Sequence, residues 1–510
     1  MTLLRKPEAT TWGVAGCGAH FSPKSYFLLA AITTGALLVH GYHPMVEDAE
    51  IYVPAIKKLL DPALYPYNAQ FFIGQTRFSL FPHLIALSVR LSPLPLDWAL
   101  FLWQFISIFL LLLGCWRIGR CCFPKRYSAW CGVGLIAALL TLPVAGTALY
   151  IMDQYLTPRS LSTPGVALGV ASLLEGKKGP ALAWVLFTLS MHPLMGAFAV
   201  GYLALLAWFE WRPQLSGDVA PVAFLALLLP PASAAYREAV ESRSYLFLSQ
   251  WQWYECLGMI APLGLLWWFV RIGRKHNLET LERMSHALLS YGAIFAVAAG
   301  LITMPRSLIR LAEFQPMRSL HLLYVLFFVL GGGLLAQFIL KDRAWRWILL
   351  FAPLCAGMFF AQRQIFPASS HVERPGMESK NDWVRGFEWI RQHTPDSAYF
   401  ALNPTYMGSP GEDEHGFRAI AERSRLADSG KDPGAVTIAP RSADEWHEQV
   451  HALAEWHSFQ AADFRRLRGR FGVDWVVLQQ PGVAGMECPY RNAALLICRI
   501  SSAPQTTESQ

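Results

Sequence analysis

Long apolar segments recur through the first 362 of the 510 residues and constrain the fold more than any other feature of the sequence. A straight helix needs roughly 20 apolar residues to cross a bilayer, with a range of about 17–25. Only 15% of the residues are charged, whereas an average soluble protein has about 25%. The chain is therefore predicted to be an α-helical polytopic membrane protein rather than an ordinary soluble enzyme.

We expect about eleven spans within residues 1–362. The candidate segments are 26–42, 97–115, 130–151, 162–175, 180–192, 194–210, 219–235, 251–270, 284–303, 321–340 and 346–362. The segments 162–175 and 180–192 are too short to cross alone, so they are expected to be short helices inside the bundle or half-spanning segments. Pro193, which follows His192, predicts a helix break between segments 180–192 and 194–210, because proline has no backbone N–H.

Basic residues lie in alternate loops, as at 117–126, 177–178 and 271–275. Cytoplasmic loops of membrane proteins carry such an excess of lysine and arginine. This pattern places the N-terminus in the cytoplasm and, with eleven crossings, puts the tail from residue 363 on the outer side. The positive net charge belongs to residues 1–362, and the tail is slightly acidic. This distribution does not suggest nucleic-acid binding.

The first outer loop, residues 43–96, begins with three carboxylates in four residues: Glu47, Asp48 and Glu50. A carboxylate at a membrane boundary can take a proton from an incoming hydroxyl as a general base. Glu47 and Asp48 could also hold a divalent cation, Mg²⁺ or Mn²⁺, through their oxygens. The alternative is that these acids only favour the positive end of a helix over 49–60. A second, amphipathic helix is expected over 78–92.

Three arginines, Arg306, Arg310 and Arg318, lie in another outer segment and are candidates for binding a phosphate, since guanidinium groups fork onto phosphate oxygens. The alternative is that they snorkel from span ends to the interface. The remaining candidates are secondary to Asp48 and Glu47, and they are Glu50, Asp153, Arg159 and His192. Asp153 with Arg159 is interpreted as a surface ion pair in preference to a catalytic pair, and His192 as a bundle histidine in preference to a site residue.

Residues 363–500 have the composition of a soluble domain, and 501–510 are expected to be disordered. Helical and strand patterns alternate, with strands expected over 398–402, 473–478 and 493–500, which predicts a small α/β domain. The polar segment 403–435 is expected to fold back over the membrane domain. Cys488 and Cys498 lie ten residues apart around a predicted turn, where they either remain free or face each other across a hairpin as a disulfide.

The layout of the chain resembles the GT-C superfamily of polytopic membrane glycosyltransferases, including uncharacterised bacterial members. The resemblance is carried by the stretch from His43-Pro44 through Glu47-Asp48-Ala49-Glu50-Ile51-Tyr52, by Asp61-Pro62-Ala63-Leu64-Tyr65-Pro66, and by Phe471-Gly472-Val473-Asp474-Trp475 in the tail. It covers most of the chain as a layout, but its motifs are short.

The resemblance implies transfer of a sugar from a polyprenyl-phosphate-linked donor to an acceptor on the extracytoplasmic face of a bacterial inner membrane. It assigns the base to Asp48 or Glu47. The family motif is often a pair of aspartates, whereas here the first acid of the pair is Glu47, so the acting carboxylate and the need for a metal stay open. The expected partners are a lipid-linked sugar donor and membrane lipids, and the oligomeric state is not fixed.

Two other functions remain open at this stage. A transporter would need ionisable residues in the middle of its spans and would often show inverted repeats. The charges of this chain instead cluster at the ends of the apolar segments. A non-enzymatic envelope assembly protein would use the exported tail for binding and would not need Glu47 or Asp48.

Overall fold

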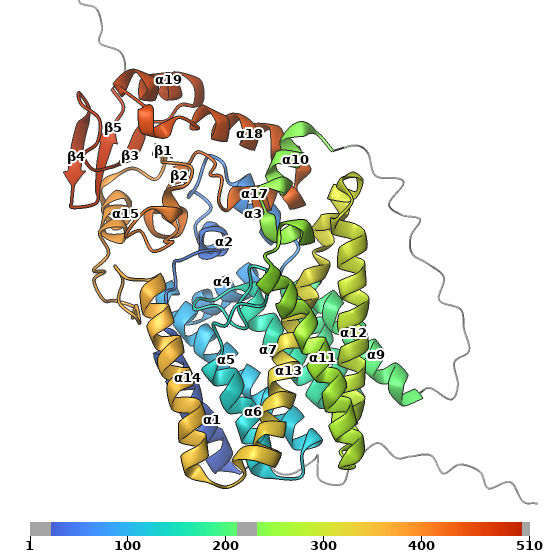
Figure 1. Ribbon diagram of the computed structural model, residues 1–510. Coiled ribbons are helices and arrows are strands. Elements are labelled where there is room, and N and C mark those ends of the chain that lie inside the picture. The colour runs from blue at the N-terminus through green and yellow to red at the C-terminus, as the bar shows by residue number, and fades with distance from the viewer. Residues whose placement is uncertain (1–21, 212–231, 502–510) are drawn as a thin grey trace, which may run out of the picture.

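The computed structural model describes residues 22–211 and 232–501. These residues form two layers, an apolar helical bundle and a mixed layer that covers one end of it (Figure 1). The predicted segment 219–235 lies almost wholly outside the described residues, and the tail predicted to be disordered, 501–510, lies outside them beyond Ser501.

The bundle contains ten helices among the described residues. They are α1 (Pro23–His40), α5 (Leu96–Cys122), α6 (Arg126–Ala138), α7 (Pro158–Leu174), α8 (Lys178–Met191), α9 (Pro193–Trp211), α11 (Trp253–Lys275), α12 (Glu279–Thr303), α13 (Ser319–Leu335) and α14 (Ala344–Ile365). The predicted break at Pro193 is confirmed, because α8 ends at Met191 and α9 begins at Pro193.

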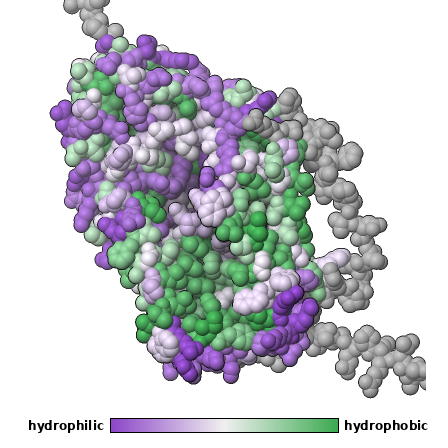
Figure 2. Space-filling view, viewed as in Figure 1, coloured by the Kyte–Doolittle hydropathy of each residue, from purple (hydrophilic) through white to green (hydrophobic). Residues whose placement is uncertain are grey.

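Five helices in the described part of the chain are long and apolar enough to cross a membrane. They are Leu96–Cys122, Trp253–Lys275, Glu279–Thr303, Leu308–Leu340 and Ala344–Ile365. The prediction of a helical protein with several membrane spans is therefore supported, but about eleven spans are not shown. The other bundle helices are too short or not apolar enough to count as candidate spans. The outer surface of the bundle is apolar between two polar ends (Figure 2), as expected for helices that face lipid.

The prediction of a span over 130–151 is wrong. Helix α6 ends at Ala138, and the chain then runs as a buried irregular segment to Thr157, with a bridge between Pro143 and Tyr150. The residues are as apolar as those of a span because the segment is enclosed by protein. Irregular backbone is tolerated at such a place when surrounding groups satisfy its polar atoms.

Close packing in the bundle depends on glycine. A Cβ at Gly332 of α13 would lie 2.8 Å from the Cα of Gly132 in α6, and one at Gly132 would lie 2.7 Å from the backbone oxygen of Val329. Small residues allow helix backbones to approach this closely in membranes. The run 331–333 thus serves helix packing.

The covering layer is built from four parts of the chain. The first outer loop contributes α2 (Ala49–Leu60), α3 (Gln70–Thr76) and α4 (Phe81–Leu91), so both predicted helices of this loop are confirmed. The segment before α11 contributes α10 (Ala234–Glu241), and the segment before α13 contributes the short 3₁₀ helices η4 (Arg306–Phe314) and η5 (Pro316–Arg318). The C-terminal region supplies the rest.

The C-terminal region is a mixed five-stranded sheet with helices on both faces. The strands are β1 (Tyr399–Ala401), β2 (Ser424–Arg425), β3 (Trp475–Gln479), β4 (Glu487–Arg491) and β5 (Leu495–Arg499), in the order β2-β1-β3-β5-β4. The helices are α15 (Asp382–His393), α16 (Phe417–Ala421), α17 (Asp432–Ile438), α18 (Ala443–Ala452) and α19 (Ala461–Phe471). The α/β prediction is thus confirmed for this region.

Side chains alternate between the two faces of this sheet, as the strand period requires. Phe400 packs with α15 and α16, whereas its neighbour Tyr399 packs with α19. Strands β4 and β5 form the predicted hairpin, and a disulfide joins Cys488 to Cys498 across it.

The first outer loop and the C-terminal region interlock through a buried ionic cluster. Glu50 of α2 accepts hydrogen bonds from the Nε of Arg425 at 3.0 Å and the backbone N–H of Arg418 at 2.7 Å. Arg418 forks onto Asp432 with two contacts of 2.8 Å. Buried charges persist only when paired in this way. The predicted fold-back of 403–435 is therefore confirmed, and α2 is held rigidly beneath the tail.

Candidate functional site

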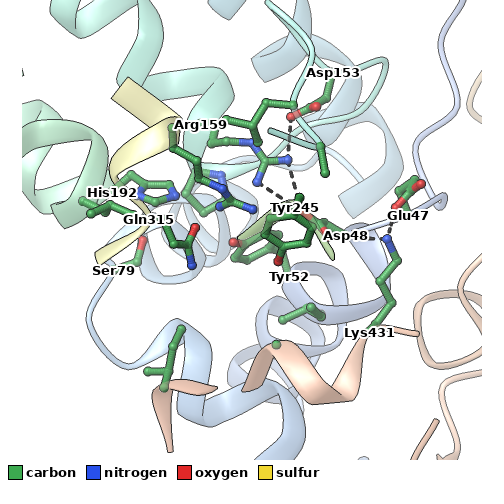
Figure 3. A pocket seen from close by; sticks show the side chains of 18 of the residues that line it. Glu47, Asp48, Tyr52, Ser79, Asp153, Arg159, His192, Tyr245, Gln315 and Lys431 are labelled. Carbon is green, nitrogen blue, oxygen red and sulfur yellow. Dashed lines mark hydrogen bonds and ion pairs between the residues drawn. The ribbon is translucent and has the colours of Figure 1, made fainter. Parts of the chain in front are cut away.

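A cavity of about 620 Å³ lies where the bundle meets the covering layer. Its walls come from the start of α2, the 143–159 segment, the α8–α9 break, residues 243–245, residues 313–318 and the start of α17. Apolar and charged side chains both line it, as the close-up in Figure 3 shows. A site of this size and mixed lining suits a small ligand with an apolar and a polar part.

Asp48 presents its carboxylate to this cavity. The Oδ2 of Asp48 accepts hydrogen bonds from Nη1 and Nη2 of Arg159 at 3.1 and 3.0 Å. Nη2 of Arg159 also lies 3.0 Å from Oδ2 of Asp153, which accepts a further bond from Thr157. The Asp48 side chain keeps 24% of its surface exposed. One carboxylate oxygen is thus fixed by Arg159, and the other, Oδ1, lies 3.6 Å from Nζ of Lys431.

Asp153 and Arg159 form the predicted ion pair, but the pair is buried and not on the surface. Pro158 and Thr157 explain its position, since Thr157 caps α7 through the N–H of Ser160 and Pro158 occupies the first helical turn. Burial raises the pKa of the Asp153 carboxyl above its usual range, against the opposing effect of Arg159. The pair therefore serves mainly to orient Arg159 toward Asp48.

Lys431, from the C-terminal region, closes the opposite side of the acidic pair. Its Nζ contacts Oε2 of Glu47 and lies 3.6 Å from Oδ1 of Asp48 (Figure 3). The backbone of Glu47 is left-handed, with φ of 54°, which turns the two adjacent carboxylates toward this ammonium. Lys431 fills the space that a cation shared by Glu47 and Asp48 would need. The arrangement does not fit a metal bridging these two residues.

Unpaired hydrogen-bonding atoms gather on the other wall of the cavity. Among the described residues, the Nε atoms of Arg243 and Arg318 are buried and have no acceptor, and Oε1 of Gln315 has no donor. All three residues line the cavity. Buried N–H groups of arginine are nearly always paired, so this wall is suited to an anionic group that accepts from both guanidiniums.

Two tyrosines, Tyr52 and Tyr245, also line the cavity. Tyr52 of α2 and Tyr245 sit close together in the centre of the site (Figure 3). Arg318 lies over the ring of Tyr245, 5.2 Å from its centroid. Burial alone would raise the pKa of Tyr245, but Arg243 and Arg318 outweigh burial and hold that pKa below its usual value. The cavity therefore carries a positive potential at this end.

Of the remaining candidates from the sequence, some line the cavity and others lie outside it. His192 lines the cavity beside Pro193. Arg310 does not line it and lies over the ring of Tyr236 at 5.6 Å. Glu50 is fully buried in the ionic cluster described above. Arg306 begins η4, and its side chain lies outside what the structure describes.

Sequence reasoning missed Lys431, Arg243 and Tyr245. Arg243 and Tyr245 lie in the stretch before α11, where no local pattern distinguishes them from the neighbouring polar residues. Lys431 lay in the segment expected to fold back, and its contact with the first outer loop is not marked by any local pattern. Only the three-dimensional contact between α2 and the start of α17 identifies it.

No protein-family model matches the chain, and no curated protein is significantly similar to it in sequence. The functional argument therefore depends on the site geometry.

Proposed function

We propose that this protein is a membrane glycosyltransferase that moves a sugar from a polyprenyl-phosphate-linked donor to an acceptor hydroxyl or amide. The observation that carries the proposal is one cavity at the edge of the apolar bundle that is lined both by an oriented carboxylate, Asp48, and by two arginines with unpaired N–H groups, Arg243 and Arg318. A carboxylate and cationic donors in one cavity suit a nucleophilic acceptor and a phosphate leaving group.

In the proposed reaction, Asp48 is the general base. Its Oδ1 takes the proton of an acceptor hydroxyl while the acceptor oxygen bonds to the anomeric carbon of the sugar. The bond between that carbon and the phosphate oxygen breaks, and the electron pair leaves with the lipid phosphate. Arg159 keeps the other oxygen of Asp48 fixed, which orients the base without direct contact to the substrate.

Arg318 and Arg243 are proposed to bind the phosphate and stabilise the charge that develops on it. Their unpaired Nε atoms supply donors that no protein group uses in the described residues. Preorganised donors aimed at developing charge are often the largest single contribution to catalysis. No step is assigned to Mg²⁺ or Mn²⁺, because Nζ of Lys431 occupies the position that an ion shared by Glu47 and Asp48 would need.

The lipid part of the donor is proposed to reach the cavity from the bilayer. Phe78 lines the cavity and is 65% exposed, and Phe314, between two lining residues, is 62% exposed. Exposed aromatic side chains at this point indicate that the cavity opens toward apolar surroundings. A tail in lipid and a headgroup in the cavity match an amphipathic substrate.

We further propose about eleven spans, a cytoplasmic N-terminus and an extracytoplasmic C-terminal region in a bacterial inner membrane. The alternation of basic loops supports this orientation. The Cys488–Cys498 disulfide also supports it, because disulfides persist in oxidising compartments outside the cytoplasm.

The decisive experiment measures release of lipid phosphate by purified protein in nanodiscs with a panel of radiolabelled polyprenyl-phosphate sugars. Asp48→Asn should lower kcat by about 10²–10⁴, the usual contribution of a general base. Glu47→Gln should have a smaller effect, because Glu47 contacts Lys431 rather than an open part of the cavity.

Glu455→Gln, at an exposed acid of the same layer, is the matched control and should keep wild-type turnover. Equal turnover in wild type and Asp48→Asn would remove Asp48 from the mechanism. Absence of turnover with every donor would favour the transporter or assembly functions.

A further inference from the structure

A second polar cluster lies away from the cavity, where α10 meets α18. It consists of Glu238 on α10 and of His447 and His451 on α18. Among the described residues, no other group of three His, Cys, Asp or Glu side chains brings its ligand atoms within 4.8 Å of one another. The proposed function does not use any of the three.

The geometry points to a site for a single transition-metal ion, of the Zn²⁺ class, that links α10 to α18. Two histidines four residues apart lie on one face of a helix, one turn apart, and their rings are 4.1 Å from centroid to centroid. Oε1 of Glu238 lies 2.8 Å from Nε2 of His451, and Oε2 lies 2.9 Å from Nδ1 of His447. The ligand atoms of the three side chains thus lie within 4.8 Å of one another.

The distances are compatible with zinc. Zinc binds imidazole nitrogen and carboxylate oxygen at about 2.0–2.2 Å with tetrahedral angles, so its ligand atoms lie roughly 3.3 Å apart. Small rotamer changes would bring the three atoms of this cluster to that spacing. Three protein ligands leave a fourth position for water, because the site is at the surface, with His451 53% exposed.

One feature of the cluster indicates that hydrogen bonding alone does not satisfy it. Nδ1 of His447 is buried and makes no hydrogen bond, although it lies 2.9 Å from Glu238. The contact has the distance of a hydrogen bond without the required alignment. A metal ion would satisfy this nitrogen and the carboxylate together.

The two helices that carry the ligands are already held in place. Tyr236, Ala239 and Val240 of α10 pack into the same buried cluster as Trp446, with Val450 against it. A scaffold that positions ligands before the metal arrives reduces the cost of ordering them. Nitrogen ligands favour zinc over Mg²⁺ and Ca²⁺, which prefer oxygen.

Binding at this site would hold one wall of the cavity. The chain passes from α10 directly to Arg243 and Tyr245, and Nη2 of Arg243 donates to the backbone oxygen of Lys431 at 2.8 Å. A metal between α10 and α18 would thus fix the segment before α11 against the C-terminal region without entering the cavity.

The test uses full-length protein in nanodiscs, purified without a polyhistidine tag and stripped with a chelator. Zn²⁺ is titrated against a competing chromophoric chelator. Wild type should bind one ion at this site, and His451→Ala should weaken that binding at least 100-fold, because even changes outside the ligand shell cost about 10–100-fold. Glu238→Gln should also weaken it.

His457→Ala is the matched control, since His457 is an exposed histidine of the same region and lies outside the cluster. Zn²⁺ should raise the thermal unfolding midpoint of wild type and His457→Ala but not of His451→Ala. All variants should unfold at the same midpoint without zinc, because the replaced side chains are partly or fully exposed. Excess Mg²⁺ should not displace the zinc.

Equal zinc affinity in wild type and His451→Ala would overturn the proposal. Wild-type affinity in Glu238→Gln would also overturn it, since the site would then be a surface histidine pair that does not link the helices. Neither result depends on glycosyl transfer, so this proposal and the proposed function fail independently.

Discussion

At the level of single residues, some side chains of the site are held by ion pairs, whereas others have buried hydrogen-bond donors without an acceptor. Arg159 is fully used by Asp48 and Asp153, and Arg418 by Asp432. Arg318 instead keeps a buried Nε without an acceptor among the described residues. Under the proposed function, this contrast makes Arg318 the candidate for ligand binding and Arg159 the candidate for positioning Asp48.

Arg318→Gln should therefore lower kcat for glycosyl transfer by about 10²–10³, the typical cost of losing one donor to a developing oxyanion. Arg310→Gln should leave turnover near wild type, because Arg310 lies over Tyr236 outside the cavity. Steady-state kinetics of both variants with the accepted donor check this. A larger loss in Arg310→Gln than in Arg318→Gln would contradict the placement of the phosphate.

The sequence predicted Asp48 because an acidic motif directly after the first span is unusual for a bundle loop. It did not distinguish Arg310 from Arg318, since both lie in one outer segment and local spacing carries no information about the direction of a side chain. It also placed Asp153 and Arg159 on the surface. Their burial follows from enclosure by α2 and the 139–157 segment, which no local pattern reveals.

At the level of elements, hydropathy predicted the bundle helices but did not distinguish a membrane span from a buried irregular segment. Four of the predicted segments, 97–115, 284–303, 321–340 and 346–362, fall within long apolar helices, and a fifth, 251–270, overlaps one that begins at Trp253. The segment 130–151 failed because a buried loop and a span have the same composition. Helices α2 and α4 were predictable because amphipathic spacing marks a helix with one buried face.

The α6–α13 contact is expected to be intolerant of added volume. Gly332→Ala should destabilise the bundle by about 1–3 kcal/mol through overpacking, since its Cβ would meet the backbone of Gly132. Gly357→Ala in α14 is the matched control, because no atom lies within 4 Å of a Cβ there. Thermal unfolding in detergent measures both, and equal midpoints would contradict the close packing.

A histidine–carboxylate link joins the end of α1 to the C-terminal region. Oε1 of Glu373 lies 3.0 Å from Nδ1 of His43 and 3.2 Å from Nε2 of His415, whose Nδ1 donates to the backbone oxygen of Glu412. Burial opposes the charge on both Glu373 and His415, but their mutual attraction is stronger. It lowers the pKa of Glu373 to about 2 and raises the pKa of His415.

Stability should therefore depend on pH with a maximum near pH 5–6. The contribution of Glu373 is present above its unfolded pKa and is lost as pH falls toward 2, whereas that of His415 is lost as pH rises through its raised pKa. Thermal unfolding from pH 5 to 9 tests this, and Glu373→Gln should remove most of the slope. Parallel profiles for wild type and variant would exclude the link.

At the level of the whole molecule, the membrane half and the C-terminal half are not independent. Nζ of Lys57 contacts Glu422, and Nδ2 of Asn68 lies 2.7 Å from Oε1 of Gln449. The cavity takes Asp48 from one half and Lys431 from the other. The sequence suggested a boundary at residue 362, but composition cannot show that parts on either side of such a boundary share buried cores.

The proposed orientation can be tested on intact cells. Ser458→Cys, at an exposed position in the C-terminal region, should react with a membrane-impermeant maleimide before permeabilisation. Lys275→Cys, at the exposed C-terminal end of α11, should react only afterwards. Labelling of both mutants, or of Lys275→Cys alone, would reverse the assigned topology.

The contact between Asn68 and Gln449 joins residues 381 positions apart in the chain, and this has a consequence for biosynthesis. The ribosome makes the Asp48 segment early and the Lys431 segment near the end, and non-local contacts of this kind form slowly. The nascent protein thus inserts its helices while the cavity is incomplete. The cavity gains its last wall only after the Lys431 segment has been delivered and has docked, so assembly of the site waits for the C-terminal region.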